Sequence, residues 1–573
     1  MREEIQKIFR GEVDDSYETL LAYSHDASLL EVMPKVVVYP VDSEDVKNLV
    51  KWVSDNKEKY PELSITARCA GTDMSGGAIG ESIIMDFTRH MNKLIGGPLP
   101  MRDKSEWEIS VQPGMFYRDF EKITLGKSLI LPCYTASKSL NAMGGMYGNN
   151  SAGERTLKYG KTEDYILSAK IVFSDGNEYL IKPLTENELN KKMAMGGAEG
   201  EIYRRINKLI TGNEDDIKHA KPNVHKNSAG YYIWNVINTE QSEKYFDLNK
   251  LLVGSQGTLG IVTEITFKII PNVKYSKLVA IFLNDLSSLG RLVDDILGLN
   301  PETLESYDDK TMKLAVKFFP DFLKNRGIFG MFKLAKSFMP EFFMLITGGL
   351  PKLILLAEFS GENEAEVDQK CLKLKEKIKD FKLKIHITEN EAEANKYWDI
   401  RRESFALLRK HIKGMHTAPF IDDIIVRPEF LPKFLPELNA ILNKYKLTYT
   451  LAGHAGDGNF HIIPLMDFKR PNTAKIILEL GDKVYDLVIK YRGSITAEHN
   501  DGLIRTPYLS KMYGEKIIRI FTEIKSIFDQ KNIFNPGKKV LIKNIDGSGS
   551  TGAGTKEYIA SHLVEGHSLS HKV

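Results

Sequence analysis

The 573-residue sequence is poor in cysteine, and the three present, Cys69, Cys133 and Cys371, form no CxxC pair. An iron–sulfur cluster ligated only by cysteine needs four thiolates, so no such cluster can form within this chain. Few and widely separated cysteines are also typical of a reducing compartment. We therefore expect a cytoplasmic protein.

Long apolar runs and strong net charge are absent as well. No run of 18 uncharged apolar residues occurs, so no transmembrane helix is expected. The charged N-terminus MREEIQKIFRGEVDD has no apolar stretch, so a secretory signal is not expected either. A formal net charge of +2 gives no basis for nucleic-acid binding. What remains is the composition of an ordinary globular protein, long enough for two to four domains.

The chain divides into two regions of different pattern. Residues 36–132 alternate strand-like and helix-like segments, KVVVYP, SEDVKNLVKWVSDN and LSITARCAG, with Ser43 as the expected helix N-cap. Strands are also expected at YILSAKIVFSDG and LGIVTEITFKIIP. Beyond Pro271, strands such as KLVAIFL and KLILLAEFS are separated by long helical segments. We place a domain boundary near residue 272.

Two further stretches have a distinct composition. Residues 311–350 mix Phe, Leu and Met with lysines at helical spacing, which fits either two helices over a core or a basic amphipathic surface resting on a membrane. Residues 546–573 read as a flexible Gly/Ser linker followed by a short helix candidate and a histidine-containing, solvated tail.

Four loops rich in small residues each lie beside an expected strand. They are RCAGTDMSGGAIG (68–80), VQPGM (111–115), NAMGGMYGNNSAGERTLKYGKTEDYI (141–166) and VGSQGTLGIVTE (253–264). Glycine lets backbone amides approach an anion closely. None of the four is a GxGxxG or GxxxxGK[ST] motif, which leaves a Rossmann or Walker site unsupported. Four such loops together favour a long ligand such as a dinucleotide.

These loops resemble the FAD-binding domain of the PCMH-type, or vanillyl-alcohol-oxidase-like, flavoproteins. The likeness is greatest to the branch of D-lactate, glycolate and D-2-hydroxyglutarate dehydrogenases, and it extends from AYSHDAS (22–28) to IFNPGKKV (533–540). It implies an α+β fold in which a two-subdomain FAD-binding domain (1–272) precedes a cap domain with an antiparallel sheet (273–500). A C-terminal segment (501–545) would return to the FAD domain.

The resemblance also implies a set of residues that bind FAD. The first loop contains no histidine, so we expect FAD to be held noncovalently. The implied residues are Gly71, Thr72, Asp73, Met74, Ser75, Gly76, Gly77, Pro113, Gly114, Gly144, Gly145, Asn149, Ser151, Gly153, Gly254, Gly257, Thr258, Gly260, Ile261 and Asn535.

The stretch LAGHAGDGNFHIIPL (451–465) places two histidines in a glycine-rich interruption of an apolar strand, and GSITAEHNDG follows at 493–502. Two histidines and one carboxylate can form a three-ligand metal site with positions left open for substrate. The alternative is that the histidines are ordinary polar residues of a core. By the resemblance, His454, His461 and Glu498 would bind a divalent metal (zinc, manganese, iron or cobalt). His499 would be the catalytic base, and Asn459 would face the substrate.

A carboxylate substrate also calls for a guanidinium. In YWDIRRESFALLR the resemblance favours Arg401, with Arg402 as the competitor. PFIDDIIVRP lacks the lysine with which some relatives meet a second carboxylate. Asn500 stands where many relatives have glycine, and asparagine tolerates the left-handed backbone.

The implied activity is FAD-dependent, metal-assisted oxidation of a D-2-hydroxy acid such as D-lactate or D-2-hydroxyglutarate. Some relatives continue into an iron–sulfur domain, whereas this sequence runs into the Gly/Ser tail. Electrons are therefore expected to pass to a quinone or a separate electron-transfer protein. Three alternatives stay open: a related FAD oxidase, an alkylglycerone-phosphate-synthase-like enzyme, and a non-catalytic flavin electron-transfer subunit.

Overall fold

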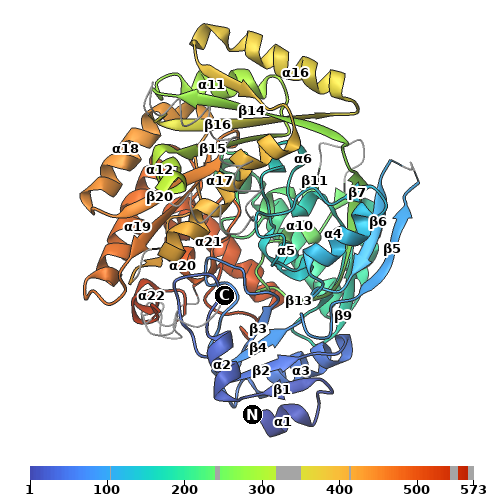
Figure 1. Ribbon diagram of the computed structural model, residues 1–573. Coiled ribbons are helices and arrows are strands. Elements are labelled where there is room, and N and C mark those ends of the chain that lie inside the picture. Colours follow the sequence, from blue (N-terminus) through green and yellow to red (C-terminus); the bar gives the residue numbers. More distant parts are fainter. Residues whose placement is uncertain (103–104, 239–244, 318–349, 412–413, 542–552, 565–573) are drawn as a thin grey trace.

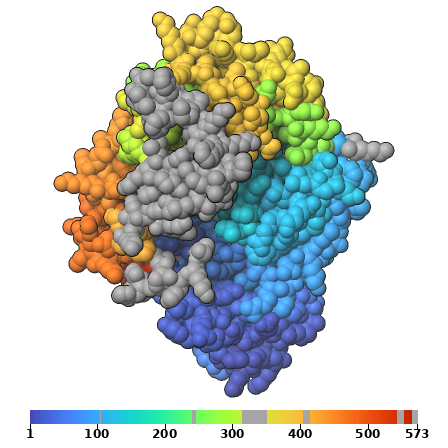
Figure 2. Space-filling view, in the orientation of Figure 1, coloured from blue at the N-terminus to red at the C-terminus, as the bar shows by residue number. Residues whose placement is uncertain are grey.

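The computed structural model describes residues 1–102, 105–238, 245–317, 350–411, 414–541 and 553–564. The N-terminal half and the second half form two masses in contact, as the blue-to-cyan and green-to-orange regions of Figures 1 and 2 show. Each mass contains its own sheets, and the sheet membership of the chain changes between Pro271 and Tyr275. The fold is α+β, as expected from the sequence.

The first sheet has four strands and lies near the N-terminus. Its spatial order is β1 (Glu12–Asp14), β2 (Val36–Tyr39), β4 (Ile83–Asp86) and β3 (Ile65–Arg68). The last three run parallel, as the alternation of strand and helix suggested. Helix α3 (Ser43–Asn56) packs Val46, Leu49 and Val53 onto this sheet. Its N-cap is Asp42 rather than Ser43, because the Asp42 carboxylate accepts hydrogen bonds from the Glu44 and Asp45 amides.

The second sheet of the N-terminal half is antiparallel. It runs β5 (Leu94–Pro100), β6 (Trp107–Val111), β13 (Ile261–Pro271), β8 (Ile166–Val172) and β9 (Glu178–Ile181), with β7 (Leu129–Ile130) also paired to β13. A three-stranded sheet lies nearby, formed by β10 (Leu184–Thr185), β12 (Tyr245–Phe246) and β11 (Ile237–Asn238). Residues of β13 alternate between buried and half-buried, which is the pattern of a strand with one face on the core.

One antiparallel sheet forms the frame of the second half. It contains β17 (Lys384–Ile387), β14 (Tyr275–Leu283), β16 (Leu353–Gly361), β15 (Thr303–Asp308), β20 (Thr448–His454), β21 (Asn459–Met466) and β18 (His416–Thr417), with β19 (Ile424–Ile425) also paired to β21. The sheet is buried on both faces: Leu278 and Ala280 belong to one apolar cluster, and Val279 and Ile281 to another.

Helices cover the two faces of this sheet. Those whose apolar residues share the cluster of Val279 and Ile281 are α11 (Leu289–Leu297), α16 (Glu364–Lys377), α18 (Leu431–Lys444) and α19 (Thr473–Lys490). On the opposite face, Met312 of α12 (Asp309–Lys317) and Trp398 of α17 (Glu391–His411) pack beside Ala452. His454 and His461 lie on the same face of the sheet as Ala452.

The remaining helices connect these sheets. They are α1 (Arg2–Gln6), α2 (Tyr17–Tyr23), α4 (Tyr117–Leu125), α5 (Met143–Asn149), α6 (Thr156–Tyr159), α7 (Glu186–Ala194), α8 (Gly197–Gly212), α9 (Glu214–Ala220), α10 (Asn249–Leu252), α20 (Gly502–Arg505), α21 (Leu509–Phe528) and α22 (Lys556–Ser561). After α21 the chain returns to the first sheet, where the Ile65 amide donates to the Ile533 carbonyl at 2.7 Å. The C-terminal segment thus contacts the first sheet of the N-terminal half.

The C-terminal tail and the stretch 311–350 were both given a specific expectation from the sequence. The tail differs from a wholly solvated one, since residues 553–564 are placed against the protein and include α22, with Ile559 only 2% exposed. Most of the stretch 311–350 lies outside the described residues, so its proposed membrane contact is not addressed by the structure. Among described residues, no helix has the length and apolar character needed to cross a membrane.

Candidate active site

The glycine-rich stretch 451–465 forms a β-hairpin rather than one interrupted strand. β20 ends at His454 and β21 begins at Asn459, and the register places Ala452 opposite His461. Opposite residues, and residues two apart, share a face of the sheet, so both imidazoles lie on one side with ring centres 5.3 Å apart. The turn requires Gly458, which has φ +75° and whose added Cβ would lie 1.8 Å from a backbone oxygen.

Glu498 and His499 are fastened to this hairpin by a buried aspartate. Oδ2 of Asp423 accepts four hydrogen bonds, from the Thr496 hydroxyl at 2.7 Å and from the amides of Ala497, Glu498 and His499 at 2.8, 2.8 and 2.7 Å. Charge-assisted bonds of this kind are strong, so Asp423 fixes the backbone that carries both residues. The next residue, Asn500, has φ +68°, as its tolerance of left-handed backbone allows.

Each of the three imidazoles is held at Nδ1 by an acceptor. His454 Nδ1 lies 2.6 Å from Glu305 Oε1, and His499 Nδ1 lies 2.6 Å from Asp422 Oδ2. His461 Nδ1 lies 3.1 Å from the backbone oxygen of Asp422. An Nδ1–H that donates to oxygen leaves the lone pair of a neutral imidazole on Nε2. All three rings are therefore oriented to present Nε2.

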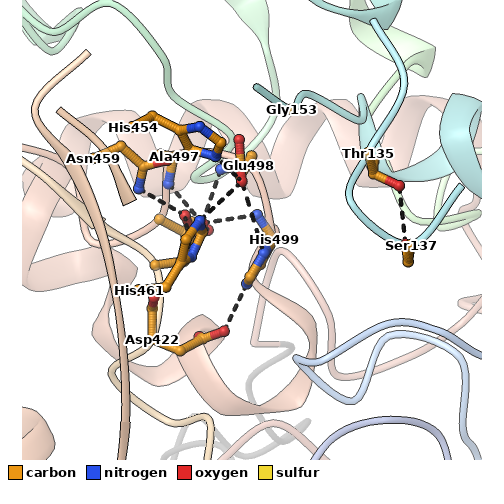
Figure 3. Close-up of polar contacts among 12 residues, drawn as sticks. Thr135, Ser137, Gly153, Asp422, His454, Asn459, His461, Ala497, Glu498 and His499 are labelled. Carbon is orange, nitrogen blue, oxygen red and sulfur yellow. Dashed lines mark hydrogen bonds and ion pairs between the residues drawn. The ribbon is translucent and has the colours of Figure 1, made fainter. Parts of the chain in front are cut away.

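The three Nε2 atoms converge on one carboxylate oxygen. They lie 3.1 Å (His454), 3.2 Å (His461) and 3.9 Å (His499) from Oε1 of Glu498, as Figure 3 shows. Lone pairs directed at an anionic oxygen repel it unless positive charge lies between them. This donor set fits a divalent cation held by imidazole and carboxylate, with outer acceptors that orient the ligands.

Acidic residues around the site raise the pKa of two of its histidines. Burial opposes protonation of His454, but Glu305 and Glu498 outweigh it and raise its pKa to about 9. Burial likewise opposes protonation of His499, and Asp422 raises its pKa to about 10. Protons and a metal ion are alternative ways to supply the same positive charge.

A fully buried lysine orients the second oxygen of Glu498. Lys226 Nζ lies 3.0 Å from Glu498 Oε2 and 3.0 Å from Asp457 Oδ2. Burial favours the neutral carboxyl form of Glu498, but Lys226 and His454 lower its pKa well below the usual value. With Oε2 taken by Lys226, Oε1 is left to face the imidazoles.

The donors can be grouped in more than one way. Ligand atoms of Asp423, His461, Glu498 and His499 lie within 4.8 Å of one another. The Asp423 carboxylate is already occupied. Its Oδ2 accepts the four hydrogen bonds described above, and its Oδ1 accepts a fifth from the side-chain amide of Asn459 at 3.0 Å. Asp423 is therefore better placed to fix the backbone than to bind an ion. The shorter distance from Glu498 favours His454 over His499 as the third ligand, beside His461 and Glu498.

The two residues expected to bind substrate are placed differently. Arg401 is 7% exposed, lines the central cavity and forms an ion pair with Glu305, the residue that also holds His454. Asn459 is fully buried, and its amide donates to Asp423 and to the Ile424 carbonyl oxygen at 3.1 Å. That Asn459 contacts the substrate stays a prediction. In the structure its side chain instead stabilises the hairpin through these two hydrogen bonds.

A cavity of about 2520 Å³ joins the histidines to the glycine-rich loops. It is lined at one end by His454, His461, Glu498 and His499. The expected FAD-binding residues on its wall are Gly71, Thr72, Asp73, Met74, Gly77, Pro113, Gly144, Gly145, Asn149, Ser151, Gly153, Gly257 and Gly260. The expected residues outside that lining are Ser75, Gly76, Gly114, Gly254, Thr258, Ile261 and Asn535.

The loops fit a flavin nucleotide, with one modification of the expected contacts. Gly145 and Gly257 line the cavity, and a Cβ at either position meets no protein atom closer than 3.5 Å, so glycine there keeps the space open. The amides of Ser75 and Gly77 donate to the Asp73 carboxylate at 2.9 and 2.6 Å. These two amides are therefore already occupied, and an anionic group of the nucleotide would be bound by the backbone amides that precede Ser75 in this loop. Asn535 supports the loops from behind by donating to the Gly77 and Gln256 carbonyls.

Several residues of the site were not predicted. They are Lys226, Glu305, Asp422, Asp423 and Asp457, together with Arg505, which pairs with Asp422. The two adjacent aspartates before IIV were visible in the sequence, where a pair of acidic residues beside a buried strand is a signal for a polar function. Lys226 and Glu305 carry no comparable local signal.

Fold and cavity together define a protein of two parts whose shared cavity is lined by glycine-rich loops and by a cluster of histidines with Glu498. Residues 34–180 match the FAD binding domain, and residues 273–539 match the C-terminal domain of FAD linked oxidases. The chain belongs to this family of flavoproteins.

Curated relatives and solved structures agree with this assignment. The chain is 26% identical over 534 residues to D-2-hydroxyglutarate dehydrogenase of Pseudomonas putida, covering 92% of this chain and 50% of the relative. It is 26% identical over 530 residues to glycolate oxidase subunit GlcD of Bacillus subtilis, covering 92% and 93%. The chain thus spans about half the length of the D-2-hydroxyglutarate dehydrogenases it matches. The fold resembles that of p-cresol methylhydroxylase (TM-score 0.64, 16% identity, 92% and 93% covered).

Proposed function

We propose that this chain is a flavoenzyme that oxidises a D-2-hydroxy acid to the 2-oxo acid, using noncovalent FAD and a divalent cation. The observation that carries the proposal is the convergence of three imidazole Nε2 atoms on Glu498 Oε1, at one end of a cavity whose other end is built from glycine loops. The names of the relatives, a D-2-hydroxyglutarate dehydrogenase and a glycolate oxidase subunit, support a 2-hydroxy acid as substrate.

The bound groups and the protein would divide the chemistry between them. FAD would supply the hydride acceptor, and a cation held by His454, His461 and Glu498 would supply a Lewis acid for the hydroxyl. His499 would take the hydroxyl proton at Nε2, since Asp422 occupies its Nδ1. For this, His499 must be neutral, and positive charge beside Glu498 favours that form.

The substrate carboxylate would be met by Arg401. Its guanidinium lies at the cavity wall, already paired with Glu305, so it is held in one orientation before the substrate arrives. Near His461 the cavity is lined by Ala452, Ile463 and Phe468, and also by His416 and Thr417. The segment PFIDDIIVRP lacks the lysine with which some relatives meet a second carboxylate, and this supports D-lactate before a dicarboxylate such as D-2-hydroxyglutarate.

Electrons would leave the flavin to a quinone or to a separate electron-transfer or iron–sulfur protein. The lysines and aromatic residues of 311–350 would bring the protein to the inner face of a membrane. Flotation with anionic liposomes, compared with a variant lacking this stretch, tests the contact; equal recovery of both proteins in the soluble fraction would refute it.

The activity is tested by anaerobic flavin bleaching. The purified protein should be yellow, and D-2-hydroxy acids, but not their L isomers, should bleach the flavin absorbance. Prior removal of metal with a chelator should slow bleaching, and adding back a divalent cation should restore it. Bleaching by no hydroxy acid would refute the proposal and favour a non-catalytic electron-transfer subunit. Rapid reoxidation by oxygen would instead indicate an oxidase.

A further inference from the structure

The C-terminal residues 553–564 reach into the same cavity. Ser561, His562, Leu563 and Val564 line it together with the glycine loops. Near its start, Gly554 packs against Gly537, and the segment continues as α22, which lies beside α19 (Figure 1). The segment, here called the C-terminal strap, was expected from the sequence to be solvated.

On one side the strap is bound to the second half of the protein. Lys556 Nζ lies 2.8 and 2.7 Å from the two carboxylate oxygens of Asp482, on α19. Ile559 is 2% exposed and lies among Phe420, Tyr485 and Tyr508 at a small cavity. Burying an isoleucine side chain stabilises such an arrangement. These contacts anchor the strap to the cap domain.

On the other side the strap pairs with the N-terminal half as a short strand. The Glu31 amide donates to the His562 carbonyl at 2.8 Å, and the Val564 amide donates to the Leu29 carbonyl at 3.1 Å. Leu30 and Leu563 form an antiparallel bridge between these two bonds. The Tyr558 hydroxyl adds a hydrogen bond to Glu81 at 2.7 Å.

The segment that receives the strap supports the first glycine loop. Two residues before Leu29, the Ala27 amide donates to the Asp73 carbonyl at 2.9 Å. Arg68, at the start of the loop, donates to the His25 carbonyl at 2.7 Å. A continuous set of hydrogen bonds therefore runs from the strap through residues 25–31 to the loop.

We propose that the C-terminal strap is part of the flavin nucleotide site, where it closes one wall of the cavity and holds the glycine loop in its binding conformation. The inference rests on FAD being the cofactor of this chain. It assigns a binding role to residues 553–564, with a dinucleotide as the ligand, and it explains why the strap is bound to both halves of the protein. Loss of the strap should speed the release of FAD.

Two chain ends give a matched test. A protein ending at residue 552 lacks the strap, whereas one ending at residue 564 keeps it and loses only the residues beyond. Release of FAD is followed as the rise of flavin fluorescence after dilution. We expect release to be at least about 10-fold faster for the shorter protein, because two backbone hydrogen bonds to residues 29–31 and the bond from Tyr558 to Glu81 are lost together. The longer protein should match the full chain within about 2-fold.

A single-residue pair keeps the test valid if the shorter protein fails to fold. Val564→Pro removes the amide that donates to Leu29, and Val564→Ala keeps it. We expect release from the proline variant to be ~2- to 10-fold faster than release from the alanine variant, the range that one backbone hydrogen bond gives. Hydrogen exchange of the flavin-free protein should show faster exchange at the Glu31 and Ala27 amides in the shorter protein.

Equal FAD release from the full chain, the protein ending at 552 and Val564→Pro would overturn the inference. Release from Val564→Ala as fast as release from Val564→Pro would attribute the effect to side-chain packing instead, and would also overturn it. A full-length protein that binds no FAD at all would overturn the cofactor assignment, and the role of the strap with it.

Discussion

The sharpest test of the site separates the metal ligand from the base. His454 and His499 both present Nε2 to Glu498, at 3.1 and 3.9 Å, and both have an acidic partner at Nδ1. The proposal gives them different roles. His454→Ala should remove one of three ligands, whereas His499→Ala should remove only the proton acceptor.

The expected magnitudes differ accordingly. Loss of an outer partner of a ligand typically lowers metal affinity ~10- to 100-fold, so loss of His454 itself should lower it by at least about 100-fold. Loss of a general base typically costs ~10²- to 10⁴-fold in rate, and His499→Ala should lose this much while keeping its metal. Part of that loss should be recovered at high pH, where hydroxide replaces the base.

The assay is metal content per flavin after gel filtration, combined with the rate of anaerobic flavin reduction. Both variants should stay yellow, because the glycine loops lie in the other half of the chain. His416→Ala is the control, since His416 lines the cavity outside the histidine cluster. If His454→Ala keeps its metal while His499→Ala loses it, the two assignments are reversed. If both keep metal and normal reduction, the site does not bind the ion.

Three further outcomes follow from the buried charges. Glu305→Gln weakens the acceptor of His454 and should lower metal affinity ~10- to 100-fold with FAD content unchanged. Lys226→Met leaves two buried carboxylates without their cation and should reduce the free energy of unfolding by about 3–5 kcal/mol in denaturant titration, with Lys226→Arg as control. Burial raises the pKa of Glu358 to about 7 against the effect of Arg155, so its contribution to stability is present at low pH and lost as pH rises through about 7. Glu358→Gln should therefore be more stable than the original protein at pH 8, and equal stability there would contradict this reasoning.

The features that the sequence indicates most clearly are those whose signal is local. The glycine loops and the hairpin histidines each combine unusual residue types within a few positions, and the pairing of β20 with β21 is set by a four-residue turn. The domain change after Pro271 coincides with a change of pattern. The N-cap at Asp42 was misplaced by one residue because serine and aspartate are both good caps, and only the backbone decides between them.

The residues that the sequence did not predict are those that approach from distant elements. Glu305 reaches His454 because β15 lies beside β20, a pairing across almost 150 residues that no spacing rule encodes. Lys226 comes from the other half of the chain. The C-terminal strap was missed for a related reason: its Gly/Ser composition describes the linker, whereas its docking depends on the surface presented by residues 29–31.

Asp422 shows how such distant residues organise the site. Its backbone oxygen holds Nδ1 of His461, while its carboxylate holds Nδ1 of His499. The first contact depends on the path of the backbone and survives any substitution that keeps the fold. The second depends on the side chain and on Arg505, which pairs with the same carboxylate. The orientation of the proposed ligand is thus set by the backbone, whereas the orientation of the proposed base depends on the Asp422 side chain and its ion pair with Arg505.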